Sequence, residues 1–134
     1  KLFNREKEMK LNTLSACLSF KKKCENSKKN FRKKIFRLKK EGKKICGYAA
    51  SAKSTTALNY CKIDHRYIDF IADSTKEKIG KFSPGMHIPI VSIKHFRDNY
   101  PDVAILCSWN HKKEIFKKEK KFVIKGGKWI SHVN

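Results

Sequence analysis

The chain has 134 residues, 40% of them hydrophobic, which fits about one globular domain with a single core. Its formal net charge of +21 is extreme, and only five of its 33 basic residues are arginine. Sequence-specific readers of nucleic acid depend on arginine, whose planar fork pairs with phosphate and guanine. The lysine excess therefore predicts salt-sensitive, non-specific attraction to polyanions and argues against base readout.

Cysteine usage indicates the redox compartment. The five cysteines are an odd number without a C-x-x-C pair, which favours reduced thiols and a cytoplasmic protein. Cys46 and Cys107 lie in apolar runs and are expected in the core, whereas Cys61 and His65 are too isolated a pair to predict a zinc site. No apolar run approaches the roughly 20 residues that span a bilayer, and no signal peptide opens the chain. A start at Lys1 instead of Met also fits a fragment of a longer protein.

Residues 1–43 have a composition typical of exposed helices. Sixteen of them are Lys or Arg and four are Glu, so over half of the net charge lies in this segment. Apolar residues recur at helical spacing, at Leu11, Leu14 and Leu18 and then at Phe31, Ile35 and Leu38. We expect two helices separated near Asn26–Ser27, which cover a sheet or link to another domain; a nucleic-acid-binding arm is the alternative.

From Lys44 onward, short apolar runs alternate with helical ones. The expected strands are 44–46, 67–72, 88–91, 103–107 and 128–131, and the expected helices are 53–61, 93–99 and 111–121. This alternation predicts a mostly parallel sheet with helices on both faces, a Rossmann-like α/β domain over residues 44–134. Ligands of such sheets bind at the carboxyl ends of the strands, which here present Gly47–Lys53, Asp73 and Ser108–Asn110.

The stretch from Lys44 to Cys61 has the outline of a phosphate-binding strand–helix unit. We expect Gly47 to allow a tight turn, and the small residues 49–52, including Ser51, to let backbone N–H groups approach an anion at the helix N-terminus. Lys53 in the first helical turn opposes the helix dipole, so it fits best if an anion lies between them. The alternative is a solvated lysine.

Three kinds of nucleotide site compete for this turn. The dinucleotide fingerprint G-x-G-x-x-G is matched weakly, because Gly47 is followed by Ala49 and Ala52. The P-loop pattern G-x-x-x-x-G-K-[ST] fits 47–54 except for Ala52 at the second glycine, and Asp73 would then mimic its Walker B acid. The third is a pyrophosphate or sugar-nucleotide site on the same turn.

Two further segments carry candidate ligand groups. The loop 73–89 is long for a small domain, and such loops are often functional. Lys78 and His87 supply cationic and hydrogen-bonding groups there, with His87 as an acid, a base, a ligand contact or a purely structural residue. Trp109 and Asn110 follow an expected core strand, where Trp109 can stack on a base or sugar or pack against a neighbouring domain.

Four motifs in a fixed order carry a family resemblance. They are GYAASAK with LNY (47–53 and 58–60), D-x4-K-x-G-x3-PG-x-HIPI (73–90), PD-x-A-x-L-x-S-WN-x3-EI (101–115) and GGKWI (126–130). Over about residues 31–130 the chain resembles the C-terminal domain of the S-adenosylmethionine-dependent sugar C-methyltransferases. Where that family usually has GYGASAKG, this chain has Ala49 and Ser54 in place of the second and third glycines.

The resemblance implies a Rossmann-like domain that helps to enclose a nucleotide-linked keto-sugar. Members are similar in having an N-terminal zinc-binding domain and a central S-adenosylmethionine-binding domain, and the implied reaction removes a proton beside the ketone so that the enolate carbon attacks the methyl group. The sequence contains neither the zinc cysteines nor a cofactor glycine loop. We therefore expect no catalytic residue, cofactor or metal in this chain, and no methyl transfer by it alone.

The expected partners are a nucleotide-linked sugar and upstream methyltransferase domains, without a membrane. The expected substrate-binding residues are Gly47, Ser51, Lys53, Asp73, Lys78, His87, Trp109 and Asn110. Two other classes of function stay open. One is a basic module that binds polyanions or nucleic acid through residues 1–43, and the other is a small P-loop-like phosphate-binding domain.

Overall fold

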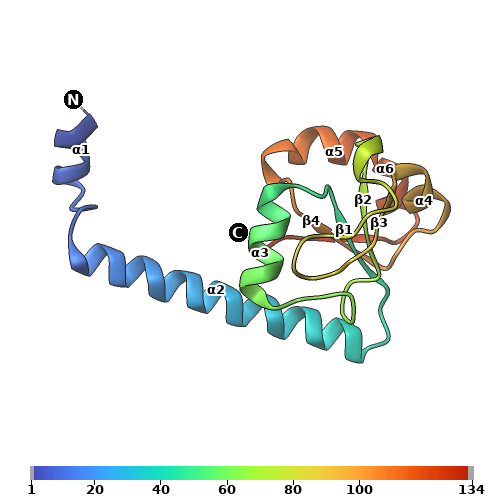
Figure 1. Ribbon diagram of the computed structural model, residues 1–134, viewed down its shortest axis with the longest axis horizontal. Helices are drawn as coiled ribbons and strands as arrows, with labels where there is room; N and C mark the ends of the chain where they lie inside the picture. Colours follow the sequence, from blue (N-terminus) through green and yellow to red (C-terminus); the bar gives the residue numbers. More distant parts are fainter. Residues whose placement is uncertain (1, 133–134) are drawn as a thin grey trace.

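The computed structural model describes residues 2–132, which form a helical arm followed by a layered α/β domain (Figure 1). The helices are α1 (Leu2–Glu8), α2 (Leu14–Lys40), α3 (Ala52–Cys61), α4 (Ile93–Asp98), α5 (Lys112–Lys118) and α6 (Lys120–Ile124). The strands are β1 (Ile45–Tyr48), β2 (Phe70–Asp73), β3 (Ile90–Ser92), β4 (Val103–Leu106) and β5 (Lys128–Ile130). Two short 3-10 turns, Lys76–Lys78 and Trp109–His111, follow β2 and β4.

The five strands form one sheet in the order β3-β2-β1-β4-β5, and every neighbouring pair is parallel. This order places β1 at the centre and reverses direction between β1 and β4, as in dinucleotide-binding folds. Parallel strands need crossover connections, and helices supply three of them, whereas the loop 74–89 with its 3-10 turn connects β2 to β3. The prediction of a Rossmann-like α/β domain is confirmed.

Side chains alternate along the strands and build a core on each face of the sheet. On one face, Ile45 and Ile105 pack with Leu58 of α3 and with Phe31 and Ile35 of α2. On the other face, an aromatic cluster gathers Tyr48, Phe96, Phe122 and Trp129 beneath α4, α5 and α6. Cys46 and Cys107 are buried, as expected from their apolar runs.

The basic N-terminal segment differs from its prediction. The interruption lies at residues 9–13, where Lys10 adopts a left-handed φ of 54°, and α2 passes through Asn26–Ser27 without a break. The side chain of Thr13 accepts a hydrogen bond from the N–H of Ala16 and begins α2 there. Weak helix formers such as Asn and Ser lower helix stability by only tenths of a kcal/mol each, about 0.5 here, so two of them do not end a long helix.

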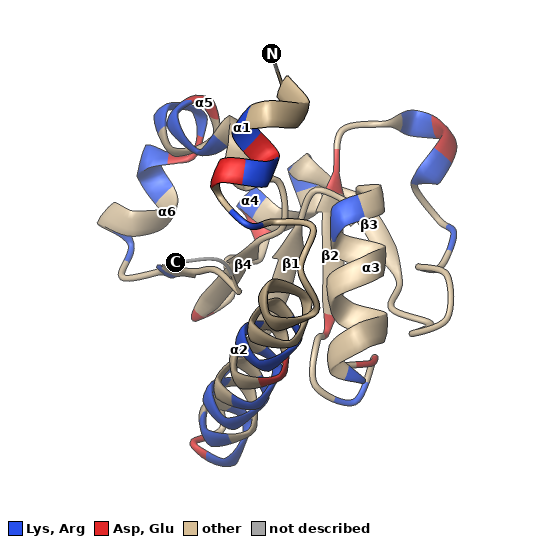
Figure 2. Cartoon of the chain, turned by 90° about the vertical axis from the view of Figure 1, so that its left-hand side faces the viewer, with Lys and Arg blue, Asp and Glu red and all other residues tan. Residues whose placement is uncertain are grey.

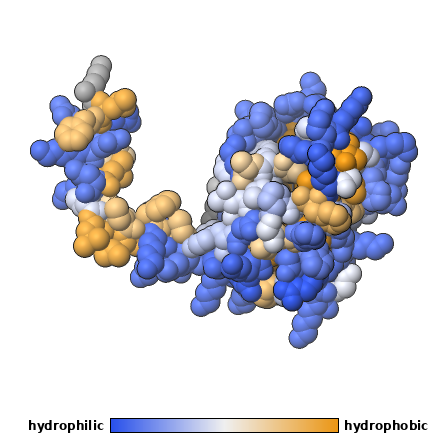
Figure 3. Space-filling model, viewed as in Figure 1, coloured by the Kyte–Doolittle hydropathy of each residue, from blue (hydrophilic) through white to orange (hydrophobic). Residues whose placement is uncertain are grey.

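The arm carries exposed apolar side chains as well as charge. The first buried side chain of α2 is Phe31, and Ser27 and Lys28 also contact the domain, at the carbonyl of His132 and the ring of Tyr60. The part of the helix before these residues projects from the domain (Figure 1). Leu14 and Phe20 are 75% and 69% exposed, and Figure 3 shows apolar side chains gathered on this arm. Across residues 2–132 no helix is both long and apolar enough to cross a membrane.

Two other elements depart from the prediction by a break or by as much as three residues at one end. The expected helix 111–121 is divided at Glu119, which ends α5 and begins α6. The second strand begins at Phe70, not at Tyr67, because residues 64–68 form a turn held by the N–H groups of Tyr67 and Ile68 on the carbonyl of Asp64.

Candidate functional site

The candidate site lies at the carboxyl edge of the sheet, where the loops after β1, β2 and β4 come together. The order of the strands reverses between β1 and β4, and in sheets of this kind ligands bind at that point. Direct contacts join the three loops. Asp73 from the end of β2 reaches the turn after β1, and Lys53 from α3 reaches Asn110 after β4.

The turn between β1 and α3 is built differently from the prediction. Gly47 lies inside β1 and makes no turn; a β-carbon there would lie 3.0 Å from Cγ1 of Ile71, so its role is close packing of neighbouring strands. The left-handed residue is Ala49, with φ of 74°. This is the position at which the sequence has alanine in place of the family's second glycine, and a β-carbon strains it.

Helix α3 begins at Ser51 with a reciprocal cap. The Ser51 side chain accepts a hydrogen bond from the N–H of Ser54, and the Ser54 hydroxyl accepts one from the N–H of Ser51. This capping box satisfies two of the free donors of the helix end. The N–H groups of Ala52 and Lys53, in the first turn, have no acceptor within the helix.

Asp73 holds the turn in place. Its Oδ2 accepts a 2.7 Å hydrogen bond from the N–H of Ala50, and its Oδ1 accepts one from the N–H of Thr75, also at 2.7 Å. Lys78 Nζ lies 3.6 Å from Asp73 Oδ2 and donates a 2.8 Å hydrogen bond to the carbonyl of Ala50. Both carboxylate oxygens therefore bind groups of the protein itself, which differs from an acid that coordinates a magnesium ion.

These contacts also control the charge of Asp73. Burial alone would raise its pKa, but the hydrogen bonds from Thr75 and Ala50, with the nearby charge of Lys78, lower that pKa below its ordinary value. The carboxylate thus stays ionised. Asp73 and Lys78 form a positioning pair for the β1–α3 turn.

Lys53 connects the first turn of α3 with the loop after β4. Its Nζ donates a 3.1 Å hydrogen bond to Oδ1 of Asn110 and lies 5.5 Å from the centre of the Trp109 ring. The ring of Trp109 in turn meets His132 edge to face at 5.0 Å. An exposed ammonium, an amide and a partly exposed indole therefore lie together at a helix N-terminus, a combination suited to an anion with an attached planar or sugar group.

The structure does not bring His87 to this group. His87 precedes β3 and so lies toward the amino ends of the strands, whereas Asp73 pairs with Ser92 at the carboxyl end of β3. Its ring stacks on Phe82 at 5.0 Å. The nearby carbonyl of Pro84 accepts a hydrogen bond from Asn59, in the second half of α3. The other seven predicted residues lie on the carboxyl side of the sheet, with Gly47 inside β1.

A pocket of about 480 Å³ opens at the same edge, over the face covered by α4 and α5. It reaches from Ala49 and Asp73 to Tyr48 and Ser108, which the sequence already placed at this edge. Three further lining residues were not assigned to the site by sequence reasoning: Arg97, His111 and Lys118. Glu114 also lines it, and the hydrogen bond from Lys118, 2.7 Å long, lowers the pKa of Glu114. The sequence contains one indication that Arg97 belongs to this pocket, namely that arginine is rare in this lysine-rich chain.

Comparison with known proteins gives two matches. The chain matches the family model described as C-methyltransferase C-terminal domain over residues 1–133. It is also 39% identical over 90 residues to "C-methyltransferase NovU" of Streptomyces niveus, a match that covers 67% of this chain. The matched segment is 21% of the relative's length, so the chain spans about a fifth of that protein.

Proposed function

The chain belongs to the family of C-methyltransferase C-terminal domains, and from this premise we propose that it is the substrate-side domain of a methyltransferase acting on a nucleotide-linked keto-sugar. The observation that carries the proposal is the group formed by Lys53, Trp109 and Asn110 at the N-terminus of α3. A diphosphate fits the ammonium and the helix end, and the indole offers a surface for a base or sugar.

The proposed role of these residues is to bind and orient the substrate. Lys53 and the N–H groups of the first helical turn hold negative charge, and Asp73 with Lys78 keeps that turn in shape. The loops after β1 and β4 shield the bound group from water on the sheet side. The family's reaction needs a base that removes a proton beside the ketone, and we place that base outside this chain.

S-adenosylmethionine is the methyl donor that this family relationship implies, and we propose that it binds outside residues 1–134. The β1–α3 turn has Ala49 and Ala52 where a dinucleotide fingerprint has glycines, so this turn does not match the glycine pattern of a dinucleotide site. Zinc is likewise proposed for a preceding domain. The exposed apolar side chains of α1 and α2 are proposed to pack against such a domain.

Calorimetry with a nucleoside-diphosphate sugar tests the site. Lys53→Ala is expected to weaken binding by about 1.5 to 3 kcal/mol, the scale of a hydrogen bond to a charged group. Lys22→Ala, on the projecting part of α2, is the matched control because it removes the same charge from an element that does not take part in the site. Equal losses for the two variants would mean that only the overall charge attracts the ligand, and the proposed site would be wrong.

A second candidate is non-specific binding of polyanions by the arm. Lysine and arginine residues recur along α2, as the blue segments of the helix in Figure 2 show. Such binding should be independent of sequence and should collapse between about 50 and 200 mM salt, because it depends on the release of counterions. A filter-binding series with two unrelated oligonucleotides measures this. A sequence preference that survives the higher salt would place nucleic-acid recognition ahead of the methyltransferase role.

A further inference from the structure

The sheet ends at β5, whose outer side has no strand beside it among residues 2–132. On the inner side, the N–H of Lys128 donates a 2.9 Å hydrogen bond to the carbonyl of Asp102, which precedes β4. Successive residues of a parallel strand direct their main-chain groups to opposite sides, so those of Trp129 face the open edge. An open strand edge is a template for pairing with another extended chain.

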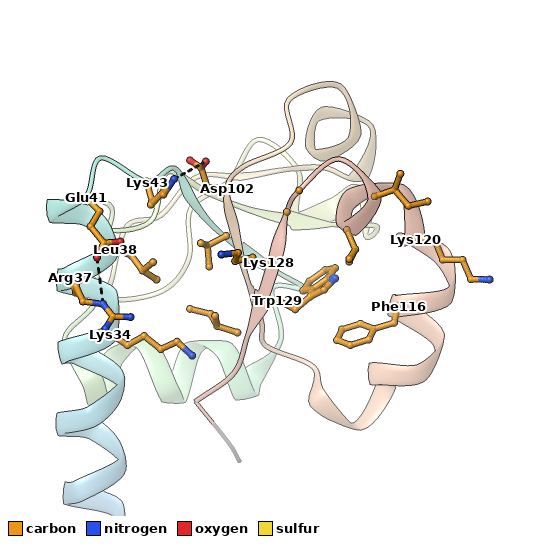
Figure 4. Close-up of a pocket in the computed structure, with 16 residues that line it drawn as sticks. Lys34, Arg37, Leu38, Glu41, Lys43, Asp102, Phe116, Lys120, Lys128 and Trp129 are labelled. Carbon is orange, nitrogen blue, oxygen red and sulfur yellow. Dashed lines mark ion pairs between the residues drawn. The ribbon is translucent and has the colours of Figure 1, made fainter.

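A groove of about 990 Å³ runs along this edge (Figure 4). The strand forms its floor, the second half of α2 forms one wall, and α5 and α6 form the other. Apolar side chains line both walls, Leu38 on α2 and Val123 and Ile124 on α6. Ile124 is 81% exposed and Val123 is 54% exposed, so this apolar wall is open to solvent.

The groove carries an excess of positive charge. Its basic residues are Lys34, Arg37, Lys43, Lys120 and Lys128, and its acidic residues are Glu41 and Asp102. Each acid already has a basic neighbour, with Arg37 3.6 Å from Glu41 and Lys43 3.7 Å from Asp102. The excess positive charge comes from three lysines, Lys34 on the α2 wall, Lys120 on the α6 wall and Lys128 on the strand that forms the floor.

We propose that this groove binds an extended acidic peptide segment of another protein, which adds a strand to the sheet beside β5. Main-chain hydrogen bonds to the open edge would supply affinity. The lysines of the groove would favour acidic side chains of the peptide, and the apolar side chains of its walls would favour aliphatic ones in alternation with them. A second copy of the chain is a poor occupant because each copy carries a charge of +21. Nucleic acid would leave the strand edge unpaired and the aliphatic walls without a partner.

A blocked peptide of about seven alternating glutamate and valine residues is the probe, titrated against the full chain by calorimetry. Binding is expected to weaken about tenfold or more with Lys128→Glu. Lys22→Glu, on the projecting part of α2, makes the same change in net charge outside the groove and should alter the affinity less than about twofold. The same peptide with alternate nitrogens methylated should also bind about tenfold more weakly, because it cannot pair with a strand.

Several results would overturn the proposal. One is the absence of binding at millimolar peptide, and another is an equal loss for Lys22→Glu and Lys128→Glu, which would mean attraction to overall charge alone. Undiminished binding of the methylated peptide would exclude strand addition. Displacement of the peptide by oligothymidylate, with an oligothymidylate affinity that Lys128→Glu also reduces, would assign the groove to nucleic acid. Concentration-dependent dimers that Lys128→Glu abolishes would assign it to a second copy.

Discussion

The hydroxyl of Tyr48 donates a 2.8 Å hydrogen bond to Oε1 of Glu119, which joins the central strand β1 to the junction of α5 and α6. Glu119 is only 1% exposed, and Arg97 of α4 donates to both of its oxygens, at 2.7 and 3.1 Å. Burial, and then this hydrogen bond to Glu119, raises the pKa of Tyr48 above its ordinary value. One carboxylate thus ties together the layer of helices on this face of the sheet.

Removing a partner of this carboxylate should destabilise the domain strongly. We expect Arg97→Met to lower the free energy of unfolding by about 3 kcal/mol, because it leaves Glu119 buried without a counter-charge. Tyr48→Phe removes one neutral donor and should cost about 1 to 2 kcal/mol. Guanidinium unfolding measures both. The double variant Arg97→Met with Glu119→Leu should recover part of the loss, and a double variant less stable than Arg97→Met would contradict this account.

A substitution at Ala49, the strained residue of the β1–α3 turn, should stabilise the domain instead. Ala49→Gly is expected to raise the free energy of unfolding by about 1 kcal/mol, because glycine adopts a φ of 74° without a clash of a β-carbon. Ala50→Gly is the control, since Ala50 is not left-handed. The change adds freedom to the unfolded chain, which destabilises by about 0.4 to 1 kcal/mol, and it also removes a methyl group that packs partly against the core. Thermal melts compare the two. If both variants lose stability, Ala49 is not strained in solution.

Asp73 should govern stability at acidic pH. Its pKa is lowered on folding, so its contribution is fully present above the ordinary value of 3.8 and is lost as the pH falls through the lower folded value. Asp73→Ala should cost about 2 to 3 kcal/mol at neutral pH, since two backbone N–H groups lose their acceptor. It should also flatten the fall in stability below about pH 4.

The matched control for this experiment is Asp98→Ala, which removes an exposed carboxylate paired with Lys94 on the surface of α4. Surface pairs of this kind contribute about 0 to 1 kcal/mol. Denaturant unfolding of the two variants and the parent chain from neutral pH to pH 3 gives the comparison. An acid profile of Asp73→Ala that matches that of the parent would show that Asp73 does not hold the turn.

The projecting arm should contribute little to the stability of the sheet. Deletion of residues 1–23 is expected to change the free energy of unfolding by less than about 0.5 kcal/mol, because the buried side chains of α2 begin at Phe31. Ile35→Ala, in the packed half of the same helix, should cost about 2 to 4 kcal/mol. Urea unfolding separates these outcomes. Loss of cooperative unfolding in the truncated chain would mean that the arm packs on the domain in solution.

The sequence by itself determined the fold class and most of the elements. Apolar runs at 44–46, 67–72 and 103–107 alternate with helical segments, and a parallel sheet buries such runs on both faces. Four local motifs were sufficient for the family, which the comparison confirms. These features are local patterns, and each can be recognised without knowledge of contacts across the fold.

Conformation at the β1–α3 turn was harder to assign. The sequence marks Gly47 as the flexible residue, yet that glycine is needed for close approach to Ile71, and the left-handed position belongs to Ala49. A glycine in a sequence shows that a β-carbon is absent, but the reason for its absence depends on the neighbouring strand. The site roles assigned to Lys53, Trp109 and Asn110 stay predictions, while their proximity is now known.

Only the tertiary structure decided which distant side chains meet. Glu119, in the run KKEKKF, has the sequence environment of a solvated residue, but it is buried at the junction of α5 and α6, where it is bound by Arg97 and Tyr48. His87 belongs to the same family motif as Asp73, but the two residues lie at opposite ends of the strands. His87 precedes β3, whereas Asp73 pairs with Ser92 at the carboxyl end of β3. Burial and proximity depend on pairs of residues far apart in the chain, and no local pattern of residue types encodes those pairs.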